Sequence, residues 1–185
     1  MRKRILVITG VPGTGKTSFS NRLAKELPGS EIVHVTEVVN EKRLFRKKAG
    51  EKVADMGRLQ AELERRIALS AEKNVVLESH LLCDLKLKDA NVLVLREHLV
   101  VLYKRLSARR YARAKINANI ISEATDYCGI RADRNYARVF EAFSSDKRLV
   151  AYARKLLDGN LPKGRPIDLL PEFDTMLRRN RSLLR

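Results

Sequence analysis

The sequence predicts a three-layer α/β sandwich with a mainly parallel central sheet. Short apolar runs rich in β-branched residues alternate with longer segments whose apolar residues recur every three or four positions. A glycine-rich turn joins the first apolar run to the first helical segment. No internal repeat or low-complexity tract divides the 185 residues, so we expect a single domain.

Four elements are expected before the longest helix. Residues 3–9 form a β-branched run of the kind found in buried parallel strands. Residues 17–27 follow as a helix, because their apolar side chains recur at four-residue spacing. A second strand is predicted at 31–35. The charged stretch 37–48 is interpreted as a surface helix that stops near Gly50.

The next helix is amphipathic and is followed by two more strands. Its buried stripe consists of Met56, Leu59, Leu63 and Ile67. The strands are predicted at 74–77 and 91–95, and polar or charged residues follow each of them. Because parallel strands end at one edge of a sheet, this edge is where we expect the functional residues.

The remainder of the chain is expected to be mainly helical. The predicted elements are a helix at 99–106, a helical face at 116–124, a strand within 135–143, a helix at 147–157, an extended Pro-rich stretch at 161–171 and a final helix at 172–184.

The amino-acid composition indicates which kinds of binding partner and which cellular compartment to expect. Lys and Arg total 38 against 22 Asp and Glu, a formal charge of +16, which favours polyanions such as nucleotides and RNA. The two cysteines, Cys83 and Cys128, form neither a CxxC motif nor a Cys/His cluster, so no disulfide framework or zinc site is predicted. We therefore expect a reducing, cytoplasmic setting. The short apolar run at 5–8 predicts neither a secretion signal nor a membrane span.

The strongest motif is Gly10-Val11-Pro12-Gly13-Thr14-Gly15-Lys16-Thr17, which fits GxxxxGK[ST] between a predicted strand and a predicted helix. Glycines let the backbone curl around an anion, and the helix N-terminus offers unpaired N–H groups to phosphate. The lysine supplies a charge for the β- and γ-phosphates and acts in catalysis, while the threonine hydroxyl binds Mg²⁺. The predicted ATP-binding residues are Gly13, Thr14, Gly15, Lys16, Thr17 and Ser18, together with Arg109 further along the chain.

A second group follows the strand that ends in Val-Val-Leu-Glu-Ser-His. Glu78 is the expected acid beside Mg²⁺, and His80 is expected to orient a water molecule or contact a phosphate. The side chains of Glu78 and His80 point to the same face of the sheet if the strand extends to His80. The competing interpretations are a carboxylate paired with a nearby base and a buried, hydrogen-bonded imidazole.

A third group consists of arginines. Arg96 follows a strand, where it is expected to contact the phosphates of either nucleotide, and Arg105, Arg109 and Arg110 precede Tyr111. Such a cluster suits a closing lid that brings positive charge onto a transferring phosphoryl group, with Arg109 as the first candidate. In a chain of charge +16, a solvated basic face is an equally good interpretation.

These residues resemble a known family. The loop form GxPGxGK[ST], the strand end ESH and the segment VLREHLVVLYKRLSARRYARAKINANIISEA are similar to the atypical adenylate kinase and ATPase class of archaea and eukaryotes. The resemblance covers about residues 3–143. Its central pattern is met by Arg105, Leu106, Arg109, Tyr111, Lys115, Asn119 and Glu123.

The resemblance implies a nucleoside monophosphate kinase fold with a P-loop, a monophosphate-binding region at about 36–73 and a lid at about 109–127. It implies phosphorylation of AMP with ATP and Mg²⁺, together with an ATPase activity in maturation of the small ribosomal subunit. The implied specificity is broad, so the implied partners are AMP or another nucleoside monophosphate, a ribosomal protein of the small-subunit platform and, transiently, small-subunit rRNA. Among family members, a eukaryotic one is also found in the nucleus.

Two departures from the family pattern are visible. Its usual Asp-x-His is Glu78-x-His80, which lengthens the acidic arm, and a small residue between the lid arginine and tyrosine is replaced by Arg110. The sequence leaves three alternatives open: an assembly ATPase with little kinase activity, a small-molecule kinase of the shikimate or dephospho-coenzyme A type, and a nucleotide-gated scaffold.

Overall fold

The computed structural model describes residues 3–48 and 51–179 of the chain. Its strands are β1 (Arg4–Thr9), β2 (Ser30–His34), β3 (Phe45–Lys48), β4 (Glu51–Ala54), β5 (Asn74–Glu78), β6 (Ala90–Arg96) and β7 (Val139–Phe143). Its helices are α1 (Lys16–Glu26), α2 (Val35–Glu41), α3 (Met56–Leu69), the 3₁₀ helix η1 (His80–Asp84), α4 (Leu99–Ala108), α5 (Arg113–Ala124), α6 (Tyr127–Asn135), α7 (Leu149–Leu157) and α8 (Leu170–Arg179).

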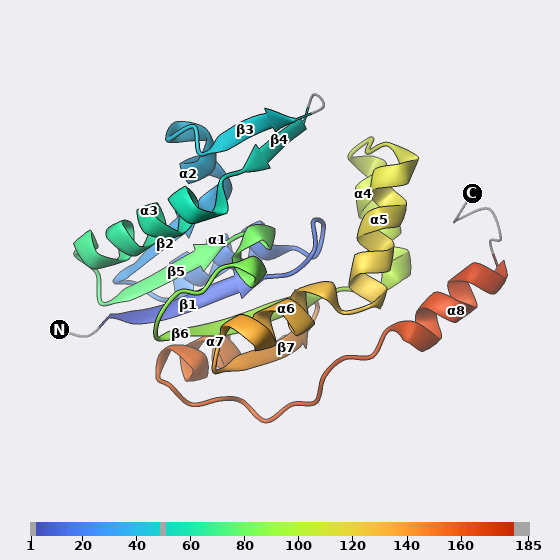
Figure 1. Ribbon diagram of the computed structural model, residues 1–185. Coiled ribbons are helices and arrows are strands. Elements are labelled where there is room, and N and C mark those ends of the chain that lie inside the picture. Colours follow the sequence, from blue (N-terminus) through green and yellow to red (C-terminus); the bar gives the residue numbers. More distant parts are fainter. Residues whose placement is uncertain (1–2, 49–50, 180–185) are drawn as a thin grey trace.

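The central sheet confirms the predicted fold class. In the described part of the chain it has five strands in the order β2-β5-β1-β6-β7, and every neighbouring pair is parallel. Parallel strands need crossovers through helices, which explains why helices lie on both sides of the sheet in Figure 1. The strand order places β1 in the middle, so the turn that follows it opens at the centre of the carboxyl edge.

Alternating side chains of β1 point into two separate cores. Leu6 and Ile8 pack with α1 and α7 on one face of the sheet. Ile5 and Val7 belong to the core of the other face, which α2, α3, α4, α5 and α6 also line. Burial on both faces accounts for the continuous apolar run that predicted this strand.

The predicted surface helix at 37–48 is wrong. Its first residues belong to α2, which starts at Val35 and ends at Glu41. Arg43 then adopts a left-handed conformation (φ 51°), and the Leu44 N–H bonds to the Val39 carbonyl oxygen at 2.9 Å, a common way for a helix to stop. The chain continues into the antiparallel hairpin β3–β4. Gly50, where the predicted helix was expected to end, lies outside the described residues.

Two elements around the site were not predicted. η1 follows the end of β5, and α6 occupies residues that were expected to lie between a helix and a strand. Hydrogen bonds join the two elements: Asn135 Nδ2 donates to the Cys83 carbonyl oxygen at 2.8 Å, and the Tyr136 hydroxyl, just after α6, donates to that of Leu82 at 2.7 Å. The pair therefore forms a single packed unit below the carboxyl edge.

The C-terminal segment runs back across the molecule. After α7 the chain is extended, as predicted, and then forms α8, which contacts α4 and α5. Leu169 is buried beside them, and the Glu172 carboxylate accepts from the Val100 N–H at 3.4 Å and lies 3.1 Å from His98 Nδ1. The predicted end of this helix near Leu184 lies outside the described residues. Within the described ranges, no helix is long and apolar enough to span a bilayer.

Candidate active site

The predicted phosphate loop lies between β1 and α1, as its motif requires. Gly10 and Gly13 have φ values of 137° and 98°, a region that side chains with a Cβ rarely adopt. A Cβ on Gly10 would lie 2.3 Å from the Leu95 carbonyl oxygen, and one on Gly13 would lie 2.7 Å from Leu102 Cδ1. The loop therefore fits against β6 and α4 only with glycine at these positions.

Lys16 occupies the centre of this loop. Its Nζ donates to the carbonyl oxygens of Gly10 and Val11 at 2.8 and 2.9 Å. Burial lowers the pKa of the ammonium group, and the Glu78 carboxylate opposes that shift. The loop thus holds a desolvated cation whose bonds to neutral carbonyls can be exchanged for bonds to an anion.

Thr17 and Glu78 meet across the mouth of the loop. The Thr17 hydroxyl donates to Glu78 Oε1 at 3.2 Å, and Glu78, at the end of β5, is almost fully buried. His34 Nδ1, at the end of the neighbouring strand β2, lies 3.0 Å from the same oxygen. No local sequence signal indicates His34, because only the order of the strands in the sheet brings its strand end beside that of Glu78.

His80 lies near Glu78 but is not carried by the strand. β5 ends at Glu78, and His80 is the first residue of η1. Although His80 is exposed, partial loss of hydration against the loop lowers the pKa of its imidazole, and the positive charge of Lys16 lowers it further. His80 is therefore neutral at pH 7, a form that can accept a hydrogen bond as well as donate one.

Two pockets open on the P-loop and share its glycines. The first, here called the Glu78 pocket, has a volume of about 320 Å³, a size suited to small ligands. Its polar lining comes from Lys16, Thr17, Ser18, Thr36, Glu78, Ser79, His80, Arg109, Tyr111 and Lys115. It joins the P-loop to α2, the end of β5, η1 and residues 109–115, so groups from five parts of the chain face one space.

The second pocket, called the Ser144 pocket, has a volume of about 400 Å³ and lies on the other side of the loop. It is lined by Gly13, Gly15, Ser18, Phe19, Arg22, Arg105, Arg109 and Ser144. Arg109 lines both pockets, as do Gly13, Gly15 and Ser18. The predicted loop residues thus lie between two spaces, and Arg109 reaches each of them.

Arg105 and Glu97 form an ion pair that holds the backbone of the P-loop. Arg105 Nη1 donates to the Gly13 carbonyl oxygen at 3.1 Å and lies 2.7 Å from Glu97 Oε2. The same carboxylate oxygen accepts from the Ser144 hydroxyl at 2.5 Å. Glu97 was not predicted to have a role, since a carboxylate after a strand gives no sequence signal of the distant arginine that it binds.

Arg96 is not a phosphate ligand, contrary to the proposed role for this residue. Its side chain is 1% exposed and is enclosed by three carboxylates. These are Glu123 at 3.1 Å, Asp126 at 2.5 Å and Glu141 at 2.6 Å, and together with Arg96 they form the Arg96 cluster. The cluster ties the end of α5 and the start of α6 to strands β6 and β7, so Arg96 anchors the junction between these two helices.

The Arg96 cluster makes stability depend on pH. Burial raises the pKa of Asp126 to about 7, as does the nearby Glu141 carboxylate, against the opposing effect of Arg96. The folded chain thus holds a proton that the unfolded chain releases near pH 4. The free energy of unfolding should therefore fall as pH rises from about 4 to about 7.

Replacing Asp126 with asparagine should flatten this dependence, because the amide cannot ionise. Urea denaturation of the wild type and Asp126→Asn at pH 5 and pH 8 measures the slope. Asp174→Asn, at an exposed aspartate of α8, serves as the control and should retain the wild-type slope. An unchanged slope in Asp126→Asn would remove Asp126 as its source.

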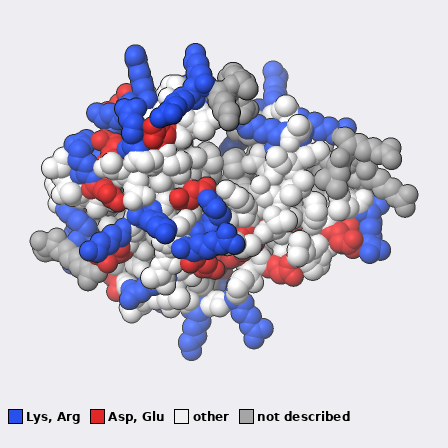
Figure 2. All heavy atoms as spheres, viewed as in Figure 1, with Lys and Arg blue, Asp and Glu red and all other residues white. Residues whose placement is uncertain are grey.

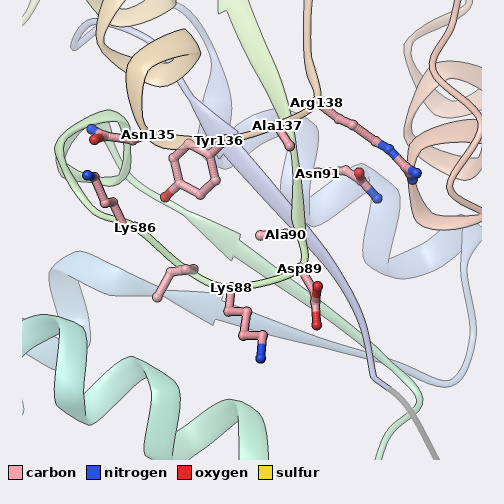
Figure 3. Close-up of a pocket in the computed structure, with 10 residues that line it drawn as sticks. Lys86, Lys88, Asp89, Ala90, Asn91, Asn135, Tyr136, Ala137 and Arg138 are labelled. Atoms are coloured by element: carbon pink, nitrogen blue, oxygen red, sulfur yellow. The ribbon is translucent and has the colours of Figure 1, made fainter.

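A third pocket lies away from the loop, at the amino ends of β6 and β7. It has a volume of about 420 Å³, again within the range of ligand sites. Figure 3 shows its lining, which includes Lys86, Lys88, Asp89, Asn91, Tyr136 and Arg138. No predicted site residue belongs to it, and we assign it no part in the chemistry at the carboxyl edge.

The parallel sheet, the strand–loop–helix at its centre and the buried loop lysine define a P-loop nucleotide-binding protein. The family model described as "AAA domain" matches residues 6–126. The chain therefore belongs to this AAA-domain family of P-loop proteins.

Archaeal proteins are among its curated relatives. A protein of Methanosarcina barkeri named "Putative adenylate kinase" is 31% identical over 90% of this chain and 100% of its own length. A protein of Pyrococcus abyssi with the same name is 34% identical over 77% of this chain and 76% of its own. The similarity thus extends over most of each protein.

Solved structures show the same fold at low identity. Shikimate kinase from Acinetobacter baumannii in complex with shikimate is 15% identical, with a TM-score of 0.55 over 84% of this chain and 92% of that one. A tunicamycin resistance protein of Deinococcus radiodurans is 18% identical, with a TM-score of 0.53 over 89% of this chain and 100% of that one. At this identity the likeness concerns the fold alone.

Proposed function

We propose that this chain is an adenylate kinase of the atypical class, which transfers the γ-phosphoryl group of ATP to AMP and forms two ADP. The main support for this proposal is that two pockets adjoin the same P-loop and that Arg109 lines both of them. A phosphotransferase needs a donor and an acceptor on opposite sides of the transferred group. The relatives named as adenylate kinases support AMP as the acceptor.

The two pockets suit different parts of the reactants. The Ser144 pocket offers Phe19 and Arg22 as flat or delocalised surfaces for the adenosine of ATP, whose phosphates would follow the P-loop. The Glu78 pocket would hold AMP within the proposed monophosphate region, residues 36–73, which contains most of α2, the hairpin and α3. The proposed lid, residues 109–127, contains α5 and supplies Arg109, Tyr111 and Lys115 to this pocket.

The oxygen atoms of Thr17 and Glu78 fit Mg²⁺. They lie 3.2 Å apart at the mouth of the loop, and hydroxyl and carboxylate oxygens are the donors that this hard cation prefers. Bound there, Mg²⁺ would neutralise phosphate charge. The longer arm of Glu78 is held in place by the hydrogen bond from Thr17 and the contact with His34.

The chain's own residues would mainly position the reactants and neutralise charge. Lys16 would exchange its two carbonyl bonds for bonds to the β- and γ-phosphates. Arg109, between the pockets, would stabilise the transferring group. Neutral His80 would orient the acceptor phosphate or a water molecule. No covalent intermediate is needed for in-line transfer.

The test is to measure ADP and inorganic phosphate from ATP and Mg²⁺ with AMP, CMP, shikimate or no acceptor. An adenylate kinase forms ADP in response to AMP without matching release of phosphate. ADP formation that depends on shikimate alone would assign a small-molecule kinase. ATP binding without turnover under every condition would assign a nucleotide-gated scaffold.

The second candidate is an ATPase that acts in small-subunit maturation, and the basic surface favours it. Figure 2 shows Lys and Arg along the edge that carries the hairpin and the α4–α5 pair. The exposed residues there include Lys42, Arg43, Arg46, Lys47, Lys52, Lys104, Arg110 and Arg113. Such a surface suits phosphate-driven contact with rRNA that weakens as salt rises. Phosphate release stimulated by a platform ribosomal protein or rRNA, and insensitive to AMP, would support this role.

Arg109→Ala should slow phosphoryl transfer far more than it weakens ATP binding. If Arg109 stabilises charge that develops during transfer, its loss should lower kcat by about 10²–10³-fold. Single-turnover kinetics and calorimetric titration with ATP separate the two effects. Arg110→Ala is the matched control, since Arg110 is exposed and lines neither pocket, and it should retain turnover. Equal losses in binding and transfer would make Arg109 a binding residue only.

A further inference from the structure

Cys83 and Cys128 lie against each other beneath the active-site edge. Their Sγ atoms are 3.7 Å apart, and both side chains are buried. They come from different elements, Cys83 from η1 and Cys128 from the first turn of α6. Both are free thiols, and the sequence contains no cysteine besides these two. Any intramolecular disulfide must therefore join this pair.

The pair connects the two sides of the proposed active site. Cys83 Sγ lies 3.2 Å from the carbonyl oxygen of His80, whose ring lines the Glu78 pocket. Cys128 lies two residues after Asp126, which binds Arg96 at the base of the lid. A bond between the sulfur atoms would therefore join the His80 side of the pocket to the lid anchor.

We propose that Cys83 and Cys128 are a modification site, at which a hydroperoxide forms a reversible disulfide that restricts the lid. A peroxide oxidises one thiol to a sulfenic acid and is itself reduced, to water in the case of hydrogen peroxide. The second thiol attacks the sulfenic sulfur, the S–O bond breaks, and the oxygen leaves as water with the thiol proton. Two thiols and one hydrogen peroxide thus give one disulfide and two water molecules.

The surroundings of the two thiols favour a small oxidant over a bulky reagent. Burial of both thiols excludes bulky reagents, while hydrogen peroxide is close in size to water. The hydrogen bond shared by the two thiols lowers the pKa of Cys83 and raises that of Cys128, to which burial also contributes. Because the two sulfur atoms are only 3.7 Å apart, whichever thiol is oxidised first lies within reach of the other.

A disulfide must draw the sulfur atoms from 3.7 Å to about 2.0 Å. Because Cys83 contacts the His80 backbone, this movement should displace His80 as well as fix α6. Displacements of this size in an active site lower rates by about 10- to 100-fold. We therefore expect oxidation to lower turnover at least about tenfold, and reduction to restore it. The expected loss of turnover rests on the proposed function.

The experiment treats the full chain with hydrogen peroxide, unfolds it in denaturant, alkylates the remaining thiols and maps the tryptic peptides by mass. The expected product is a cross-linked peptide containing Cys83 and Cys128 that disappears with dithiothreitol. Methionine sulfoxide adds one oxygen and is recognised separately. Cys83→Ala and Cys128→Ala are matched variants, and each should retain its unoxidised turnover after peroxide. Circular dichroism before oxidation verifies that both variants fold.

Each other outcome overturns the proposal. Unreacted thiols, sulfonic acids or disulfides between two chains would exclude the internal bond. A complete internal bond with unchanged turnover would exclude restriction of the lid, and equal peroxide inhibition of both variants would place the oxidation elsewhere. The cross-linked peptide can be detected in a chain without kinase activity, so failure of the proposed function and failure of this proposal are distinguishable.

Discussion

Lys16→Ala is expected to abolish ATP-dependent turnover. Lys16 is the cation at the centre of the P-loop, where its ammonium group donates to the carbonyl oxygens of Gly10 and Val11. Alanine would leave the β- and γ-phosphates without this charge, at a cost of at least about 10²–10³-fold in rate. Coupled detection of ADP and phosphate measures both the kinase and the ATPase reaction, and both should be lost.

The matched control for this substitution is Lys25→Ala in the last turn of the same helix. Lys25 is exposed and lines neither pocket on the loop, so turnover should remain at the wild-type level. Circular dichroism shows whether each variant is folded. Full turnover in folded Lys16→Ala would remove the P-loop as the site of catalysis.

Arg96→Met is expected to cause the largest loss of stability. The substitution would leave Glu123, Asp126 and Glu141 facing one another without their shared cation, and the first of these is 2% exposed. Removing one partner of a buried ion pair costs about 3–5 kcal/mol. Folded proteins are generally stable by only about 5–15 kcal/mol, so this loss would be a large part of the total.

Chemical denaturation compares Arg96→Met with Arg178→Met. Arg178 forms a 2.8 Å pair with Asp174, but the side chains are 79% and 60% exposed. Its loss should therefore change the free energy of unfolding by less than about 1 kcal/mol. Adding Glu123→Gln to Arg96→Met should recover part of the loss, because it removes one uncompensated charge. Similar small effects of both methionine substitutions would contradict a stabilising role for the Arg96 cluster.

The centre of the fold could be predicted because its signals are local. The apolar run of β1, the glycine spacing and the first turns of α1 are contiguous, and each independently favours the same strand–loop–helix. Glu78 could be predicted as a site residue for a related reason, since it ends a strand that is buried on both faces.

The errors arise where distant segments decide the outcome. Arg96 has the sequence context of a phosphate ligand, but its three carboxylate partners lie 27, 30 and 45 residues further along the chain. Residues 37–48 appeared to be a solvated helix because they are charged, whereas the left-handed Arg43 and the buried Leu44 redirect them into a hairpin. His34 and Glu97 gain their contacts from partners that no local pattern indicates.

The place of β1 at the centre of the sheet also determines when the phosphate loop can form. Its pairing partners are β5, about 70 residues later in the chain, and β6, about 85 residues later. During synthesis from the N-terminus, the loop sequence is therefore complete long before either neighbouring strand exists. A nascent chain that ends before Arg96 would carry the nucleotide-binding motif without the walls that shape it, so ATP should begin to protect the chain from proteolysis only once β6 has emerged.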